Sequence, residues 1–207
     1  ADANGTYAVA DLIAGSGANT SAGWTLYIVY ADPLATAKNI TLFDGFSAIS
    51  SNFLEIPISG FTTIPVGPVR AKLAFSSLEG DLGYTGDRLI INGSVLSTPN
   101  RLGNNFFNST IDYIDPTNPN LVIPFTSRNI NSSNLLGFDA GIINVPNGGN
   151  AVIANGSTTA TVRLESSGDA YFYYMNAFAV EIIQPQINLI KTVKDLAKKR
   201  QIYEEVA

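Results

Sequence analysis

Residues 158–164 read TTATVRL, and this stretch indicates the fold class of the chain. Ala160, Val162 and Leu164 alternate with polar residues, so an extended backbone places the three apolar side chains on one face and the polar ones on the other. This alternation predicts a β-strand that packs one face into a core and leaves the other in water.

Two further stretches are rich in the aromatic and β-branched residues that favour strands. The most apolar, YFYYMNAFAVEII at residues 171–183, is predicted as a central strand, with an aromatic-lined ligand groove as the alternative. TLYIVY at residues 25–30 is predicted as a buried strand, and the lone Trp24 before it is expected in the core.

Shorter strand-like runs lie between clusters of Gly, Pro and Asn. NITLF at residues 39–43 and the run at 46–49 flank Asp44-Gly45, a turn signal that predicts a hairpin. The other predicted strands lie at residues 53–58, 69–75, 88–91, 109–114, 120–123 and 151–153. Many short strands with this punctuation predict an all-β fold, an antiparallel β-sandwich of the jelly-roll kind.

The composition changes after Pro185, which divides the chain into a predicted sandwich at residues 1–185 and an extension at residues 186–207. The extension is rich in Lys and Arg, and its apolar spacing fits either a strand or a short amphipathic helix. Apolar groups in such a segment need a partner, so we expect it to contact a neighbouring domain or subunit. The residues expected in that contact are Ile187, Leu189 and Val193.

Missing residue types limit the chemistry. The 207 residues include no Cys and no His, which removes thiolate sites, the commonest general base and the commonest transition-metal ligand, so we expect no enzyme. Glu79 with Asp81, or Asp112 with Asp115, could supply two carboxylates for glycoside hydrolysis, but such pairs are ordinary in a chain of this length. The net charge of −5 argues against nucleic acid as a partner, and no apolar run is long enough to insert in a membrane.

An acidic, Gly-rich stretch follows residue 78 and supplies hard oxygen ligands in a turn-rich region, as Ca²⁺ requires. The candidate ligands of a structural calcium ion are Asp81 and Asp87, with Glu79 beside them and Asp169 from a distant turn. The alternative is that these Asp and Gly residues only form turns between strands.

Two other sets of residues are candidate surface sites. Tyr171, Tyr173 and Tyr174 are candidates for an exposed aromatic patch, although alternation puts the first two on one face and the third on the other. Seven Asn-x-Ser/Thr triplets are candidate glycosylation sites, unless the Asn-, Ser- and Thr-rich composition creates them by chance. They begin at Asn4, Asn19, Asn39, Asn92, Asn108, Asn131 and Asn155.

Eight short segments, in their order, resemble the module that lies before the first repeat in large bacterial and archaeal cell-surface proteins with conserved-repeat, immunoglobulin-like domains. The resemblance implies a β-sandwich at the cell surface, with INLIKTVKDL at residues 187–196 opening the first repeat. It implies no ligand and no reaction. Residues 197–207 lack the Gly- or Asn-containing turn of the family. The segments are NGTYAVADL (4–12), GWTLYIVYADP (23–33), NITLFDGF (39–46), GPVRAKLAF (67–75), EGDLGYTGDRLIING (79–93), NNFFNSTI (104–111), NLLGFDAGII (134–143) and SSGDAYFYYMNAFAVEI (166–182).

These observations predict a secreted, extracellular structural or adhesive module of the cell surface. Only 14% of the residues are charged, and Gly, Asn, Ser and Thr are plentiful, as in many extracellular β-proteins. The expected partners are copies of the chain itself, in a filament built by strand donation from residues 4–9 or 186–193, or adjacent repeat domains. The alternative is a carbohydrate-binding jelly-roll module that binds surface glycans with calcium support, and exposed aromatic residues would favour it.

Overall fold

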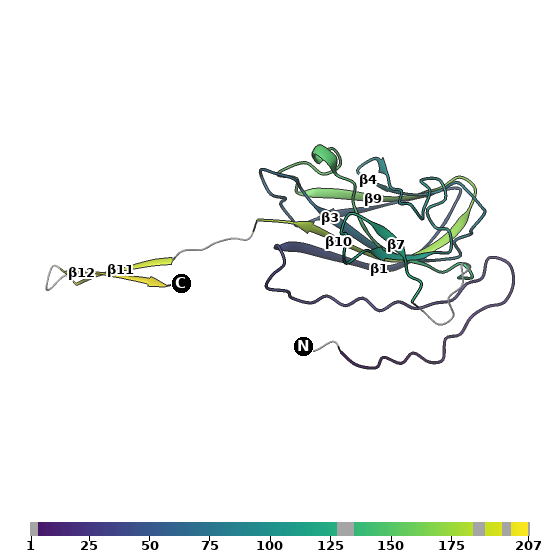
Figure 1. Ribbon diagram of the computed structural model, residues 1–207, viewed down its shortest axis with the longest axis horizontal. Helices are drawn as coiled ribbons and strands as arrows, with labels where there is room; N and C mark the ends of the chain where they lie inside the picture. Colours follow the sequence, from purple (N-terminus) through teal and green to yellow (C-terminus); the bar gives the residue numbers. More distant parts are fainter. Residues whose placement is uncertain (1–3, 128–134, 184–188, 196–199, 207) are drawn as a thin grey trace.

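The computed structural model describes residues 4–127, 135–183, 189–195 and 200–206. These residues form an all-β structure in which two larger sheets pack as a β-sandwich, and this confirms the predicted fold class (Figure 1). A single 3₁₀ turn, η1 (Gly148–Asn150), is the helical element of the described chain. The strands are β1 (Lys38–Ser50), β2 (Phe53–Ser59), β3 (Ala71–Leu78), β4 (Asp87–Ile91), β5 (Ser94–Val95), β6 (Ile111–Ile114), β7 (Val122–Pro124), β8 (Asp139–Asn144), β9 (Thr159–Ser166), β10 (Ala170–Glu181), β11 (Leu189–Asp195) and β12 (Arg200–Val206).

The larger sheet has six strands in the order β1-β10-β3-β8-β6-β7, and the second has four in the order β2-β9-β4-β5. Neighbouring strands are antiparallel except β6 and β8, which run parallel. β9 and β10 follow each other in the chain but lie in different sheets, so the turn between them passes from one layer to the other (Figure 1).

The core between the sheets follows the alternation that the sequence predicts. Ala160, Val162 and Leu164 of β9 are buried, with exposed fractions of 3% or less. β10 lies between β1 and β3 and is therefore an interior strand, as expected. Its Tyr171 and Tyr173 face the core and are 0% and 4% exposed, so the expectation of an exposed patch at these two residues is wrong.

The predicted hairpin at Asp44-Gly45 is also wrong. β1 continues through these residues, and its pairing with β10 only shifts register, from Asp44 opposite Met175 to Ser47 opposite Tyr173. The extra residues form a β-bulge, which needs the same permissive residues as a tight turn. The long β10 strand provides a partner on both sides of the bulge, so the chain has no reason to reverse there.

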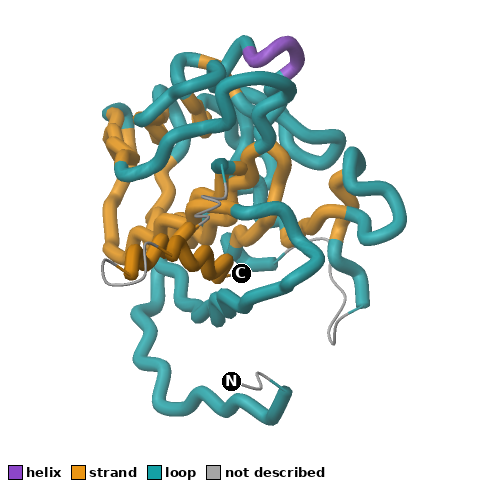
Figure 2. The backbone as a smooth tube through the Cα atoms, turned by 90° about the vertical axis from the view of Figure 1, so that its left-hand side faces the viewer, coloured by secondary structure: helices purple, strands orange, loops and turns teal. Residues whose placement is uncertain are grey.

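Residues 25–30 do not form the predicted buried strand, and Trp24 does not lie in the core. Residues 20–30 belong to no strand, and Figure 2 shows the N-terminal part of the chain as a loop trace outside the strand layers. Trp24 is 49% exposed. Apolar residues on both sides of this segment indicated burial, but the segment covers a sheet from outside, which leaves one of its sides in water.

The remaining differences concern three short stretches, one of which is the two-residue strand β5, which was not predicted. Residues 151–153 form bends rather than a strand. The strand β8, which carries Gly141 and begins at a polar Asp139, was not predicted because its sequence DAGIIN has a weak strand pattern.

The C-terminal extension contains two strands. β11 and β12 pair antiparallel with each other and form a separate two-stranded sheet, so the strand alternative holds for residues 189–195. Leu189 and Val193 lie on β11, and Ile187 lies outside the described residues. Their contact with a neighbouring domain or subunit stays a prediction. In the described part of the chain, no helix has the length and apolar character needed to cross a membrane.

Candidate functional site

Arg101 lies inside the sandwich with an exposed fraction of 0%. Its Nε donates to Asp112 Oδ2 at 3.1 Å and its Nη1 donates to Asp139 Oδ1 at 2.6 Å. The remaining guanidinium hydrogens are used by carbonyl groups. These backbone acceptors are Phe106, Thr110 and Ala140.

We call Arg101, Asp112 and Asp139 the buried ion cluster. Burial raises the pKa of both carboxyl groups, and the guanidinium opposes this rise. Asp112 is 2% exposed, so it cannot serve with Asp115 as a glycosidase pair. All the guanidinium hydrogens are used and the three side chains are inaccessible to solvent, so the cluster is structural, although Asp112 Oδ1 accepts no hydrogen bond. The sequence carried one signal of it, since Arg101 is the only charged residue between Arg88 and Asp112.

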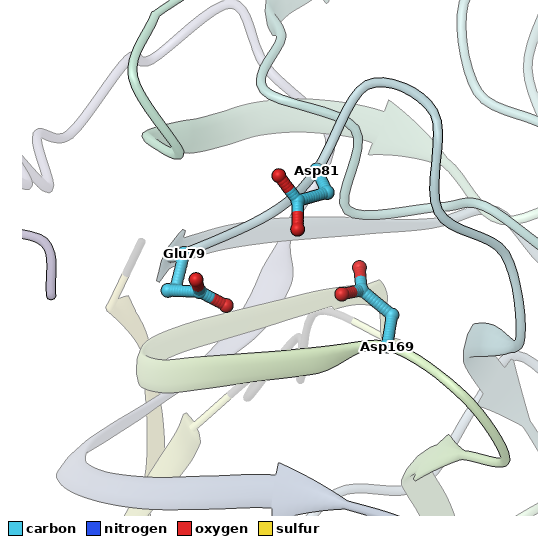
Figure 3. Close-up of side chains that lie close together, drawn as sticks. All are labelled: Glu79, Asp81 and Asp169. Atoms are coloured by element: carbon cyan, nitrogen blue, oxygen red, sulfur yellow. The ribbon is translucent and has the colours of Figure 1, made fainter. Parts of the chain in front are cut away.

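A second group of carboxylates, the acidic loop cluster, consists of Glu79, Asp81 and Asp169 (Figure 3). Glu79 and Asp81 follow β3, and Asp169 lies in the turn between β9 and β10. One carboxylate oxygen from each residue lies within 4.8 Å of the other two. No ion pair formed by the described Lys and Arg side chains involves any of the three.

The electrostatics of this cluster are unfavourable. Asp169 is 4% exposed, its Oδ1 accepts the N–H of Ala170 at 2.8 Å, and its Oδ2 has no hydrogen-bond partner. Burial raises the pKa of Asp169. Burial, followed by the charges of Asp81 and Asp169, raises the pKa of Glu79 to about 7. The described part of the chain therefore holds three acids together without a basic partner.

Asp87, the other predicted ligand, does not join this cluster. It begins β4 and is 0% exposed, and its Oδ1 accepts the N–H groups of Phe106 and Phe107 at 2.6 and 2.7 Å. Burial is the largest reason why its pKa is raised to about 6. The third acid of the cluster is therefore Glu79 and not Asp87. The side chain of Asp87 points into the core at the start of β4.

Two glycines hold the loops of the acidic cluster against each other. A Cβ on Gly86, whose φ is +118°, would lie 2.8 Å from the backbone nitrogen of Gly168. A Cβ on Gly168 would lie 2.7 Å from the carbonyl oxygen of Thr85. The loop after β3 thus packs backbone to backbone on the β9–β10 turn, and this close approach brings the carboxylates together.

A different surface is formed by residues 21–30, which we call the N-terminal strip. Its inner side is fixed to the six-stranded sheet by hydroxyl groups: Thr25 Oγ1 lies 2.5 Å from Tyr174 OH, and Tyr27 OH lies 2.8 Å from Ser76 Oγ. Tyr174, the third predicted patch residue, is therefore partly covered. Burial raises the pKa of Tyr27, as expected for a phenol enclosed between strip and sheet.

The outer side of the strip carries large side chains that remain in water. Trp24 and Tyr30 are 49% and 76% exposed, and Leu26 and Ile28 are nearly half exposed. A groove of about 680 Å³ lies between the C-terminal part of the strip and the sheet, a volume in the range of small-ligand sites. Its apolar floor is formed by Ile40, Leu42, Ala74, Ile142, Ala177 and Ala179.

The candidate glycosylation sites differ in access. Asn108 is 9% exposed and its Nδ2 donates to Asn100 O, so a glycan does not fit there in the folded chain. Asn92 and Asn155 are exposed and Asn39 is half-buried, but the Nδ2 atoms of all three donate to backbone carbonyls. Asn131 lies outside the described residues. The remaining candidates are Asn4 and Asn19, and glycosylation of the sites stays a prediction.

No family model and no curated protein matches the chain. Among solved structures, it is similar to BuGH86wt in complex with neoagarooctaose, with 12% identity and a TM-score of 0.39 over 72% of this chain and 20% of that one. A variant of the same protein with the same ligand gives 12% identity and a TM-score of 0.38, over 69% of this chain and 18% of the other. The chain thus spans about a fifth of the length of these glycoside hydrolases.

This finding corrects the expectation that the chain is not an enzyme. That expectation came from the absence of His and Cys, but the matched solved structures are glycoside hydrolases, whose chemistry needs neither residue. Similarity at this TM-score assigns no substrate and no reaction to the chain. The function must therefore be argued from the surfaces described above.

Proposed function

We propose that the chain is a carbohydrate-binding β-sandwich module of an extracellular protein, with the N-terminal strip as its ligand surface. The observation that carries the proposal is the exposure of Trp24 and Tyr30 on a strip that hydrogen bonds hold in place. Large aromatic side chains that stay in water do not gain the favourable free energy of burial. Tyr and Trp combine an apolar ring with a polar O–H or N–H group and are common at binding surfaces. Their outward position favours a role in recognition.

The strip suits a neutral oligosaccharide. The C–H faces of sugar rings pack against aromatic planes, while the sugar hydroxyls stay hydrated or bond to polar groups. In an extended backbone at about 3.3 Å per residue, Trp24 and Tyr30 are separated by about 20 Å. This distance fits an extended oligosaccharide better than a single sugar, and a neutral ligand agrees with a surface of low charge density.

The lone Trp24 makes the proposal testable by intrinsic fluorescence. Titration with neutral oligosaccharides, neoagarooctaose among them, should change the emission of the wild type, and affinity electrophoresis should show binding to the matching polysaccharide. Trp24→Ala should lower the affinity at least tenfold with little change in Tm, because the side chain is half exposed. Phe53→Ala, which alters a 58% exposed ring on β2, is the matched control and should bind normally. Unaltered binding by Trp24→Ala would refute the assignment of the strip.

A second candidate is an adhesive surface module that accepts a strand from a neighbouring domain or copy. It is favoured by the backbone of the strip, which pairs with no strand among the described residues and so leaves N–H and C=O groups free for strand addition. Light scattering would then show association that depends on protein concentration and is lost in Leu26→Pro, which removes a backbone donor. A monomer at all concentrations would exclude assembly between copies.

A further inference from the structure

We propose that Glu79, Asp81 and Asp169 bind one Ca²⁺ ion, which ties the loop after β3 to the turn between β9 and β10. The proposal is independent of carbohydrate binding, since it concerns loops at a different place from the N-terminal strip. It replaces the predicted ligand Asp87 by Glu79, because only Glu79 brings an oxygen into the acidic loop cluster.

The spacing of the oxygens fits a single calcium ion. Ca²⁺ binds oxygen ligands at about 2.3–2.6 Å, so two oxygens on the same ion can be at most about 5.2 Å apart. The three carboxylates each place an oxygen within 4.8 Å of the others. One ion can therefore contact all three with at most small shifts of the side chains, and Figure 3 shows the three side chains directed toward a common space.

A second observation, separate from the spacing, also points to a cation. Asp169 is 4% exposed and its Oδ2 accepts no hydrogen bond. A buried carboxylate oxygen without a partner is costly and needs an explanation such as an ion. The two carboxylates of the buried ion cluster, by contrast, each bind Arg101 directly. The acidic loop cluster lacks such a cation among the described side chains, and a divalent ion would supply it.

The ligand chemistry selects calcium among common ions. All three ligands are carboxylates, and the whole sequence has no His or Cys, so the softer ligands preferred by most transition metals are absent. Mg²⁺ demands near-octahedral geometry at about 2.0–2.1 Å and releases its bound water reluctantly, so three carboxylates from two separate loops suit it less well. Ca²⁺ accepts irregular geometry, and water can complete its coordination where Asp81 reaches the surface.

A bound ion would stabilise an exposed loop. Leu82 and Tyr84, in the loop between β3 and β4, are 60% and 67% exposed and have little burial to hold them. Binding of Ca²⁺ at Glu79 and Asp81 would fix the start of this loop on the β9–β10 turn, which Gly86 and Gly168 already bring into backbone contact. The ion would therefore act as a structural link between the two sheets, because that turn connects β9 with β10.

The test uses the whole chain, freed of metal with EGTA and then titrated with CaCl₂ by calorimetry and thermal melting. We expect one ion per chain and, at free Ca²⁺ 100-fold above Kd, a rise in Tm of about 5–10 °C. MgCl₂ should bind at least tenfold more weakly. An unchanged Tm together with no binding heat would overturn the site, and Mg²⁺ binding as tightly as Ca²⁺ would overturn the assignment of the ion.

Two variants separate the site from general charge effects. Asp81→Asn changes a ligand that reaches the surface, so the protein should fold and lose at least tenfold in Ca²⁺ affinity. Asp115→Asn removes an equal charge from a surface turn, where Asp115 accepts hydrogen bonds from Thr117, and should bind Ca²⁺ like the wild type. Equal Ca²⁺ affinities of Asp81→Asn and the wild type would contradict the proposal, as would an equal loss in both variants.

Discussion

The buried ion cluster and the acidic loop cluster both bring carboxylates together, but they balance the charge differently. Asp112 and Asp139 share the guanidinium of Arg101, which also bonds to three backbone carbonyls. Glu79, Asp81 and Asp169 lie as close together but have no basic partner among the described residues.

The difference separates a structural site from the proposed Ca²⁺ site. In the buried ion cluster every guanidinium hydrogen is used and all three side chains are buried, so these charges support the fold. In the acidic loop cluster no basic side chain of the described residues pairs with the carboxylates, and burial together with the neighbouring acidic charges raises the pKa of Glu79. Acidic charges without a basic partner among the described residues agree with the cation proposed above.

The largest expected effect tests the structural half of this comparison. Arg101→Met should lower the free energy of unfolding by about 3–5 kcal/mol, because it leaves two carboxylates buried without their cation. Urea denaturation followed by circular dichroism would measure the loss. Arg163→Met, a control on β9 whose ion pairs with Glu55 and Glu165 lie at the surface, should change stability little. If the two variants lost similar stability, the buried ion cluster would not be the structural centre proposed here.

The next effect concerns Asp87, a buried acid that has backbone donors but no cation. Its pKa is about 6 in the folded chain and 3.8 as the ordinary value, so the unfolded chain loses this proton first as the pH rises. The contribution of Asp87 to stability is present below pH 4 and falls by about 3 kcal/mol as the pH rises through 6. Asp87→Asn should abolish this fall, measured as the difference between variant and wild type from pH 3 to pH 8. A constant difference across this range would show that Asp87 does not titrate as described.

A moderate effect is expected from crowding at the buried ion cluster. A Cβ on Gly141 would lie 2.4 Å from Asp112 Oδ1 and 2.8 Å from the ring of Phe75. Gly141→Ala should therefore cost about 1–3 kcal/mol, the usual range for overpacking, in thermal or urea unfolding. Gly45→Ala is the control, because a Cβ there meets nothing within 4 Å. Equal stability of both variants would mean that Asp112 can move away from Arg101 without cost.

The smallest expected effect is a gain in thermal stability rather than a loss. It tests whether the three carboxylates of the acidic loop cluster repel one another when no Ca²⁺ is present. In EGTA, Asp81→Asn should raise the Tm slightly, by at most about 2 °C, because it removes one of three like charges. In Ca²⁺ the same variant should melt below the wild type. A variant less stable than the wild type in both conditions would give Asp81 a structural role like that of Asp139.

The strands were the most predictable part of the structure, because their signal is local. Alternation in β9 fixes which residues face the core, and Ala160, Val162 and Leu164 are buried as predicted. The same signal failed at Trp24, since alternation shows that a segment has two sides but not what covers each side. Asp44-Gly45, a pair typical of a tight turn, forms a β-bulge instead. The chain continues as one strand there because β10 pairs with β1 on both sides of the bulge.

The candidate sites were less predictable, because they depend on contacts between distant segments. The sequence indicated acids near residues 79–87 and Asp169, but it did not show that Glu79 points to the shared space while Asp87 is buried. Arg101 was missed, because its isolation in an uncharged stretch was the one signal of the cluster and did not identify its two carboxylate partners.

By itself, the sequence determined an all-β chain without His or Cys chemistry, with the positions of most strands and a set of acidic turns available for a hard cation. These properties follow from composition and from the two-residue period of a strand, which act over a few neighbouring residues. The tertiary structure alone decided which acids meet. The pairing of β3 with β10 and the close approach of Gly86 to Gly168 bring Glu79 and Asp81 to Asp169. Charges far apart in the chain can interact strongly only after folding has placed them within a few ångströms and removed the water between them.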